Sequence, residues 1–128
     1  MDIDGGVLVA DLEAGLGTLS RLEAGPVDAV VVVVEPTAKS IEVATRAIDL
    51  AAEQQLGEVI VVVNRVTNED DEAHVRSALG GREVIAVPDD PEVIAADRAG
   101  VGLLDAAPQS PAVAALMTLT DRLAGAAA

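Results

Sequence analysis

The stretch Asp28-Ala-Val-Val-Val-Val-Val-Glu-Pro-Thr37 decides the fold class of this chain. Its five consecutive valines, Val30 to Val34, are apolar on both faces of an extended chain, which is typical of strands in the interior of a parallel sheet. We expect this run to form the most buried strand. The glutamate, proline and threonine that follow predict a turn directly after it, as at the carboxyl end of a strand in an α/β domain.

Three further runs rich in valine and isoleucine predict strands of the same kind. They are Val7 to Asp11, Val59 to Asn64 and Val84 to Val87. Helical patterns alternate with the later strands, and each has a capping residue or a proline at its start. The predicted helices run from Thr37 to Leu56, from Asn68 to Leu79, from Asp90-Pro91 onward, and from Ser110-Pro111 to about Gly125. The alternation predicts an α/β fold with a parallel sheet of about four strands flanked by helices.

The composition limits the class of protein. A chain of 128 residues with 51% hydrophobic residues fits one domain, which we assign to residues 1–124, with residues 125–128 as a disordered tail. Without Phe, Tyr or Trp, the chain has no aromatic side chain to stack on bases. A net charge of −14 opposes binding to nucleic acid and to anionic membranes. The absence of cysteine and of a long apolar run predicts a cytoplasmic protein.

Ligands of open parallel sheets bind at the carboxyl ends of the strands, so the residues that leave each strand are the candidates for a site. The predicted exits carry Asp11, Glu13 and Gly15; Glu35, Pro36 and Thr37; Asn64 and Arg65; and Pro88, Asp89 and Asp90. Asp11 suits a Mg²⁺ ion or its water ligands, and Gly15 permits a backbone N–H to approach a phosphate. An equally weighted alternative is that Asp11 only ends a strand and Gly15 only makes a turn.

Two other polar positions have two interpretations each. The amide of Asn64 can donate and accept, which suits the edge of an adenine, but an asparagine after a strand is also a common turn residue. The segment Thr37-Ala-Lys39-Ser40 offers a helix N-terminus that favours an anion. A capping threonine beside a solvated lysine explains the same residues, and we favour that interpretation.

In their order and spacing, these segments resemble the deviant-Walker P-loop ATPases of the MinD/ParA type, and among them most closely the carbon monoxide dehydrogenase maturation (CooC-like) ATPases. The resemblance covers nearly the whole chain but only the C-terminal half of a family member. It rests on Asp11-Leu-Glu-Ala-Gly15, similar to the switch II motif; Val27-Asp28 through Glu35-Pro36-Thr37 with Ser40, similar to the following strand and turn; Asn64-Arg65-Val66, similar to the motif N-K/R-V; and Val87-Pro88-Asp89-Asp90, Val93 to Ala96, Gly100 and Ser110, similar to the closing segment.

The resemblance implies a P-loop NTPase-like (SIMIBI) half-domain that takes ATP and Mg²⁺. It implies a magnesium and phosphate-sensing role for Asp11, Glu13 and Gly15, with Asp11 as the metal ligand. It further implies a nucleotide-base site, whose residues are Asn64, Arg65, Pro88 and Asp89.

The phosphate-binding half of such a protein is absent from this sequence. No G-x-x-x-x-G-K-[ST] motif occurs, and the only lysine, Lys39, lies outside any glycine-rich loop. The resemblance therefore predicts a nucleotide-linked protein partner whose hydrolysis needs a P-loop from elsewhere. The alternative is a non-enzymatic interaction module derived from such an ATPase. A phospho-receiver domain is disfavoured, because no lysine follows the predicted last strand, Val84 to Val87.

The resemblance also predicts how the sheet is completed. In the family the P-loop strand lies between the switch II strand and the next one, which here are Val7 to Asp11 and Ala29 to Val34. An open valine-rich edge recruits another strand or aggregates. We therefore expect direct pairing of these two strands, with a protein partner or self-association through the sheet edge as the other way to fill the gap.

Overall fold

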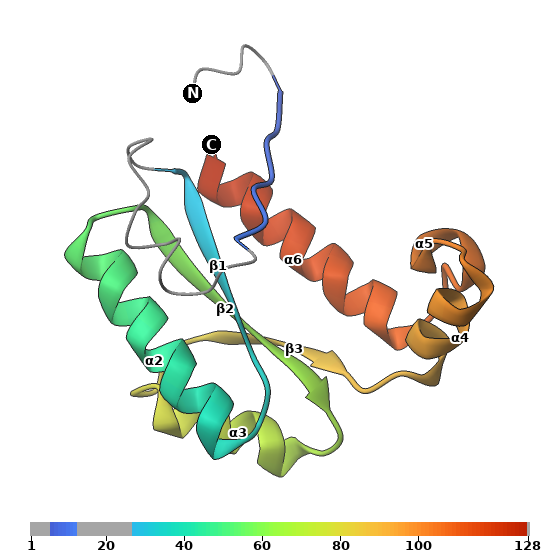
Figure 1. Cartoon of the computed structure of the whole chain (residues 1–128), viewed down its shortest axis with the longest axis horizontal. Helices are drawn as coiled ribbons and strands as arrows, with labels where there is room; N and C mark the ends of the chain where they lie inside the picture. The colour runs from blue at the N-terminus through green and yellow to red at the C-terminus, as the bar shows by residue number, and fades with distance from the viewer. Residues whose placement is uncertain (1–5, 13–26, 128) are drawn as a thin grey trace.

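The computed structural model describes residues 6–12 and 27–127 as an α/β structure, drawn in Figure 1. The elements follow one another as β1 (Ala29–Val34), α2 (Ala38–Glu53), β2 (Glu58–Val66), α3 (Glu69–Ala78), β3 (Val84–Pro88), α4 (Pro91–Ala99), α5 (Leu103–Ala106) and α6 (Pro111–Ala127). The sheet is parallel and helices flank it, so the fold class predicted from the sequence is confirmed.

The order of strands in the sheet is β1-β2-β3, which makes β2 the central strand. Its residues Ile60 to Val63 are buried, because β2 lies between β1 and β3 and has helices packed on both of its faces. The expectation that the valine run would be the most buried strand is wrong. In β1, Val32 and Val34 are buried on the face covered by α2, but Val33 points to the opposite face and is 61% exposed, because α6 packs mainly on β3 and covers β1 little.

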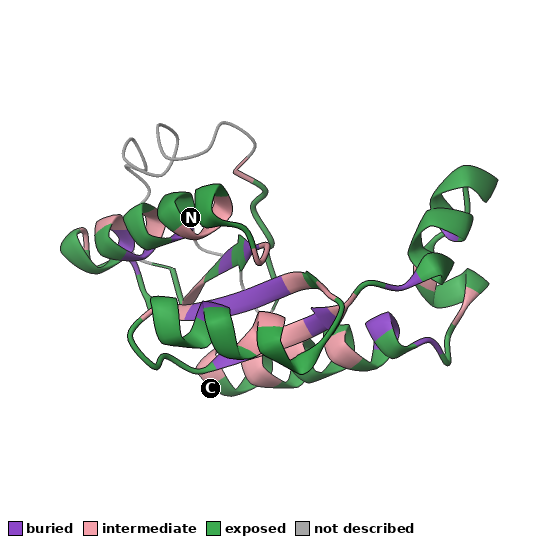
Figure 2. Ribbon diagram, turned by 90° about the horizontal axis from the view of Figure 1, so that it is seen from below, coloured by how far each residue is buried: buried purple, intermediate pink, exposed green. Residues whose placement is uncertain are grey.

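Helices cover both faces of the sheet. In Figure 2, α2 lies along one face and α6 along the opposite face, while α4 and α5 extend beyond the end of the sheet. On the first face, Val34, Val61 and Val63 pack with Ala44 and Ile48 of α2. On the other face, the strand residues Val62 and Val87 pack against Ala112 at the start of α6. The core is aliphatic, as a chain without aromatic residues requires.

The helix starts predicted from capping residues are confirmed. The side chains of Thr37, Asn68 and Asp90 accept hydrogen bonds from the first turns of α2, α3 and α4. Two features differ from the prediction. The short helix α5 has no side-chain cap and was not predicted. Helix α6 continues to Ala127, beyond the end near Gly125 that the sequence predicted, because alanine favours the helical conformation.

The expected strand Val7 to Asp11 is not a strand, and within residues 6–12 and 27–127 the sheet has three strands instead of about four. A strand is stabilised by ladder hydrogen bonds, and residues 6–12 make no backbone hydrogen bond to any other described residue. Val7 is therefore 92% exposed. Leu12 packs near Ala51 and Leu56 at the amino end of the sheet. The expected direct pairing of this segment with β1 is wrong.

Candidate functional site at the carboxyl edge of the sheet

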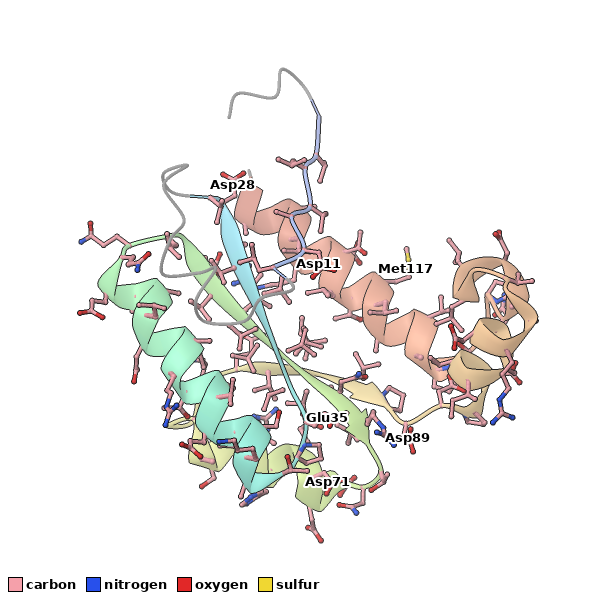
Figure 3. All side chains as sticks on the ribbon, viewed as in Figure 1. Asp11, Asp28, Glu35, Asp71, Asp89 and Met117 are labelled. Atoms are coloured by element: carbon pink, nitrogen blue, oxygen red, sulfur yellow. The ribbon has the colours of Figure 1, made fainter. Side chains whose placement is uncertain are left out.

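Three charged side chains meet where the strands end. Glu35 follows β1, Arg65 belongs to the last residues of β2, and Asp89 follows β3. The Nη1 atom of Arg65 lies 3.6 Å from Oε1 of Glu35, and its Nε atom lies 3.7 Å from Oδ1 of Asp89. Glu35 and Asp89 are labelled at this edge in Figure 3. We call these three residues the edge triad. All three are substantially exposed, so the site is an open surface.

A β-bulge places Asn64 and Arg65 at this edge. Val63 pairs with Ala86 and Val66 pairs with Pro88, so β2 has one more residue than β3 between these two pairs. Arg65 has a φ of 60°, a left-handed conformation that is uncommon for a residue with a side chain. The prediction that the strand ends at Asn64 is wrong, because the ladder resumes at Val66. An extra residue on one strand of a ladder interrupts the alternation of side chains between the two faces of the sheet.

The exit from β1 is held by a short hydrogen-bonded turn. The backbone N–H of Glu35 donates to Ser40 Oγ (2.9 Å), and the N–H of Thr37 donates to the Glu35 carbonyl (2.8 Å). Thr37 Oγ1 in turn accepts from the N–H of Ser40 (3.3 Å). These bonds support the capping interpretation of Thr37. Lys39 is 80% exposed and pairs with Glu42 on the surface of α2, away from a phosphate-binding geometry.

The exit from β3 is held equally firmly. The N–H of Asp89 donates to the carbonyl of Val66 (2.9 Å), which ties this exit to the residue after the bulge. The next residue, Asp90, is buried and accepts from Glu92 N (3.0 Å) in α4 and from Ala112 N (3.1 Å) in α6. The N–H groups of Ala112 and Glu92 hold the pKa of Asp90 below its usual value of 3.8. The sequence indicated the cap on α4 but not the bond to a residue 22 positions away.

The other predicted site residues are not part of this edge. Glu13 and Gly15 lie outside the described residues. Asp11 is exposed, and Figure 3 shows it apart from Glu35 and Asp89. Its neighbour Leu12 packs at the amino end of the sheet, which agrees with that separation. In the parts of the chain that the structure describes, no three acidic or histidine side chains form a group suited to a metal ion.

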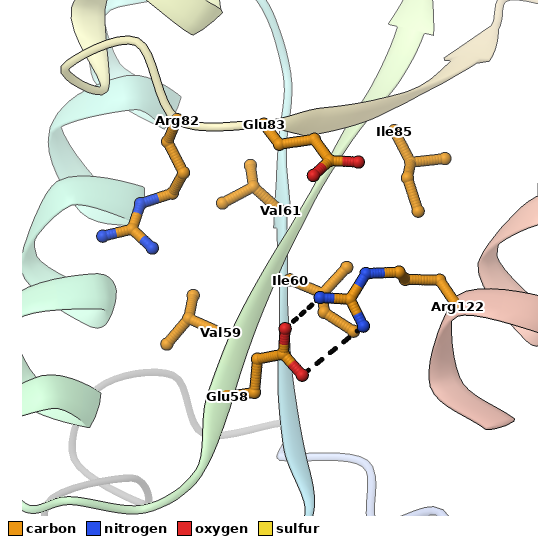
Figure 4. A pocket seen from close by; sticks show the side chains of 8 residues that line it. All are labelled: Glu58, Val59, Ile60, Val61, Arg82, Glu83, Ile85 and Arg122. Carbon is orange, nitrogen blue, oxygen red and sulfur yellow. Dashed lines mark hydrogen bonds and ion pairs between the residues drawn. The ribbon is translucent and has the colours of Figure 1, made fainter. Parts of the chain in front are cut away.

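A depression of the described surface lies at the opposite end of the sheet. It has a volume of about 170 Å³ and is flanked by Arg82, Glu83 and the bidentate ion pair between Arg122 of α6 and Glu58 of β2 (Figure 4). Parallel sheets bind ligands at the carboxyl ends of their strands. We therefore assign the candidate site to the carboxyl edge and a structural role to this ion pair, which fastens α6 to the amino end of β2.

No family model matches the chain, but comparison with known sequences finds relatives. An uncharacterized ATP-binding protein of Methanocaldococcus jannaschii is 36% identical over 125 residues, which are 94% of this chain and 47% of that protein. A second uncharacterized ATP-binding protein of the same organism is 36% identical over 97 residues, 73% of this chain and 38% of that protein. The chain thus spans about half the length, or less, of the curated relatives it matches.

Comparison with solved structures gives MinD. A chain of the MinC:MinD cell division protein complex of Aquifex aeolicus superposes with a TM-score of 0.64 and 25% identity, covering 77% of this chain and 43% of that one. The MinD cell division protein of Aquifex aeolicus alone gives a TM-score of 0.63 and 25% identity, covering 80% and 46%. No helix in the described ranges has the length and apolar character to cross a bilayer. The chain thus has an α/β fold like part of MinD, and these likenesses support a protein related to the MinD/ParA-type ATPases.

Proposed function

We propose that the carboxyl edge of the sheet is the base-binding side of an ATP site in a MinD/ParA-type protein of the CooC-like maturation branch. The observation that carries the proposal is the convergence of three strand exits, brought together by the bulge in β2. This convergence occurs in a fold similar to MinD, and the relatives of this chain are described as ATP-binding. Ligand sites at the carboxyl ends of parallel strands support the same assignment.

The residues at this edge have suitable chemistry for adenine. The amide of Asn64 can accept a hydrogen bond from the exocyclic amine of the base and donate one to a ring nitrogen. Pro88 and Asp89 lie on the neighbouring strand exit, across the ladder from Val66. Arg65 is adjacent to Asn64 in the bulge. These four residues form the proposed base side of the site.

The phosphate side of the site has to come from elsewhere. This sequence contains no glycine-rich loop with a lysine, and Lys39 is engaged on the surface of α2. Asp11, Glu13 and Gly15 keep their proposed role with Mg²⁺ and the γ-phosphate in an assembled site, where Asp11 is the metal ligand. Because Asp11 lies away from the edge triad, that role requires residues 6–12 to take another position.

A protein partner is the other part of the proposal. The MinD that resembles this chain occurs in a complex with MinC, which supports a function based on protein association. The unpaired side of β1 among the described residues provides the surface, since its backbone groups and its exposed Val31 and Val33 are available to another strand. A partner strand or a second copy of the chain would bind there.

The test is a titration of the 128-residue chain with adenosine, AMP, ADP and ATP, the last with and without Mg²⁺, followed by NMR of backbone and side-chain amides. We expect chemical-shift changes at Asn64, Arg65 and Asp89. We also expect weak affinities that differ little between adenosine and ATP, because most affinity in such sites comes from phosphate contacts and this sequence lacks the phosphate-binding loop. Micromolar or tighter binding of ATP would contradict the proposal that the phosphate side of the site comes from elsewhere. Absence of shifts at saturating adenosine would contradict the base site and favour the non-enzymatic interaction module.

Hydrolysis is tested separately. The chain offers no lysine in a phosphate cradle to neutralise charge on a transferring phosphoryl group. We expect phosphate release from ATP and Mg²⁺ at the uncatalysed rate. Release above that background, lost in Asp11→Ala, would show that an unorthodox cradle exists in this chain.

A further inference from the structure

We propose that Arg65 is a positioning residue: its guanidinium straps the ends of β1 and β3 to the bulge of β2 and so fixes the direction of the Asn64 amide. This inference rests on the proposed function, since it assigns Arg65 an indirect role in the base site. It also gives Glu35, which no motif in the sequence places in that site, a function in binding.

The two residues that carry the carboxylates of the strap have hydrogen-bonded backbones. Glu35 is held through its N–H by Ser40, and its carbonyl closes the turn to Thr37. Asp89 is held through its N–H by the carbonyl of Val66. A guanidinium that pairs with both carboxylates therefore adopts a position fixed relative to three strand ends. The planar fork of arginine suits this task, because different nitrogens can face different acceptors.

The backbone of Arg65 links the strap to Asn64. Side chains alternate between faces along a regular strand, and an extra residue interrupts that alternation. The left-handed φ of Arg65 is the point at which β2 departs from regular geometry, directly after Asn64. A side chain fixed at both carboxylates restrains this backbone, and hence the direction in which the neighbouring amide points.

The competing interpretation is that Arg65 contacts the base directly. Removing the carboxylate of Glu35 distinguishes the two interpretations. The nitrogens of Arg65 already face a carboxylate on either side. If Arg65 contacts the base itself, removing the carboxylate of Glu35 leaves binding unchanged. If Arg65 acts as a strap, the loss of Glu35 weakens binding, although Glu35 does not touch the ligand.

Adenosine is the probe, because an uncharged nucleoside has no ionic attraction of its own to the protein. The variants are Arg65→Gly, which tolerates a φ of 60° and removes the guanidinium, Arg65→Lys, which keeps the charge without the fork, and Glu35→Gln. Arg82→Gly and Glu53→Gln are matched controls on exposed residues away from the edge. We expect Arg65→Gly and Glu35→Gln to weaken adenosine binding about two- to fivefold, as exposed ion pairs allow.

The dependence of binding on salt concentration is a measurement that a purely structural role of Arg65 would not affect. Raising the salt concentration to about 1 M should weaken adenosine binding to the wild-type chain and to both controls, because salt screens the exposed ion pairs of Arg65. Binding to Arg65→Gly should not change, because this variant has no such ion pairs. Arg65→Lys should not restore wild-type affinity. Unchanged binding in Glu35→Gln, or full rescue by Arg65→Lys, overturns the strap.

The strap has a second readout that needs no ligand. In the free chain, the Nε–H of Arg65 should exchange with water more slowly than that of Arg82, and Glu35→Gln should remove the difference. The side-chain amide of Asn64 should shift in Arg65→Gly but not in Arg82→Gly. If adenosine does not bind at all, the proposed function fails. The exchange rates and the Asn64 shift then decide on the strap independently, and equal exchange rates overturn it.

Discussion

The carboxyl edge of the sheet and the segment of residues 6–12 were predicted from the same kind of sequence, but they differ in the structure. Each combines an apolar run with acidic residues directly after it. The run Val30 to Val34 pairs with β2 and delivers Glu35 to an edge shared by three strands. The run from Val7 onward makes no backbone hydrogen bond to other described residues, and its aspartate lies apart from that edge. An apolar run therefore gives the capacity to form a strand, and a paired neighbour decides whether it does.

The difference is visible in burial. Val34 in β1 is 1% exposed, whereas Val7 is 92% exposed. Burial of a valine contributes about 1.5–3 kcal/mol relative to its exposure. Segment 6–12 obtains little of that stabilisation in this structure, so its contribution to folding is expected to be small. Such an exposed apolar segment is also a candidate for contact with a partner.

The largest expected effect tests that contrast directly. Val63 in β2 is fully buried, and Val63→Ala removes two methyl groups and leaves a cavity, so we expect a loss of about 2 kcal/mol in the free energy of unfolding. Val9→Ala, in the exposed segment, should change it by less than about 0.5 kcal/mol. Urea denaturation of both variants measures the difference. Similar losses in the two variants would mean that the segment is packed in solution.

The next effect tests the proposed base side of the nucleotide site. Asn64→Ala should weaken adenosine binding by about 5- to 30-fold, the value of one or two hydrogen bonds. Asp49→Ala, on an exposed part of α2, is the control and should bind as the wild type does. An NMR titration measures both affinities. Equal affinity of Asn64→Ala and the wild type would remove the base site from the carboxyl edge.

A smaller effect concerns the pH dependence of the β3 exit. The folded-state pKa of Asp90 is lowered below 3.8, so its contribution to stability is present above that pH and is lost as the pH falls through the folded-state value. The pKa of Asp71 is lowered too, chiefly by the backbone and hydroxyl of Thr67. We expect Asp90→Asn to be less stable than the wild type at neutral pH, and the two to converge as the pH falls through the lowered folded-state pKa of Asp90. Thermal unfolding between pH 2 and pH 7, followed by circular dichroism, checks this. A difference that persists at the lowest pH would contradict the assignment.

The smallest effect is expected for Asp11→Ala. Asp11 is exposed and has no hydrogen bond or ion pair with the described residues, so the thermal midpoint and the affinity for adenosine should not change. Only the Mg²⁺ dependence of ATP binding should disappear, which calorimetric titration with and without Mg²⁺ measures. A lower thermal midpoint would show that Asp11 is packed against the domain.

Most helices were predictable because their signals are local. Thr37, Asn68 and Asp90 each bond to a backbone N–H within three residues, so the capping residue and the helix that it starts are neighbours in the sequence. Strand β1 was predicted with its observed bounds, since its apolar run ends at charged residues on both sides. The position of that strand at the edge of the sheet was not predictable, because all three strands carry similar runs.

The candidate site shows the same division. The sequence indicated Asn64, Arg65 and Asp89 as residues near strand ends, and the structure brings Arg65 and Asp89 together. It did not indicate the bulge, which arises from the mismatch in register between β2 and β3. Nor did it indicate that Glu35 shares an arginine with Asp89, because 54 residues of chain separate these two positions and only the parallel pairing of three strands brings them close.

By itself, the sequence determined the alternation of strands and helices, the helix caps, the aliphatic core and the acidic surface. These properties depend on residue type and on spacings of a few residues, which a chain carries wherever it is placed. The tertiary structure alone decided that β2 is central, that residues 6–12 stay outside the sheet and that Arg65 lies between two carboxylates. These outcomes depend on hydrogen bonds and contacts between segments far apart in the chain, where several pairings compete and burial selects among them.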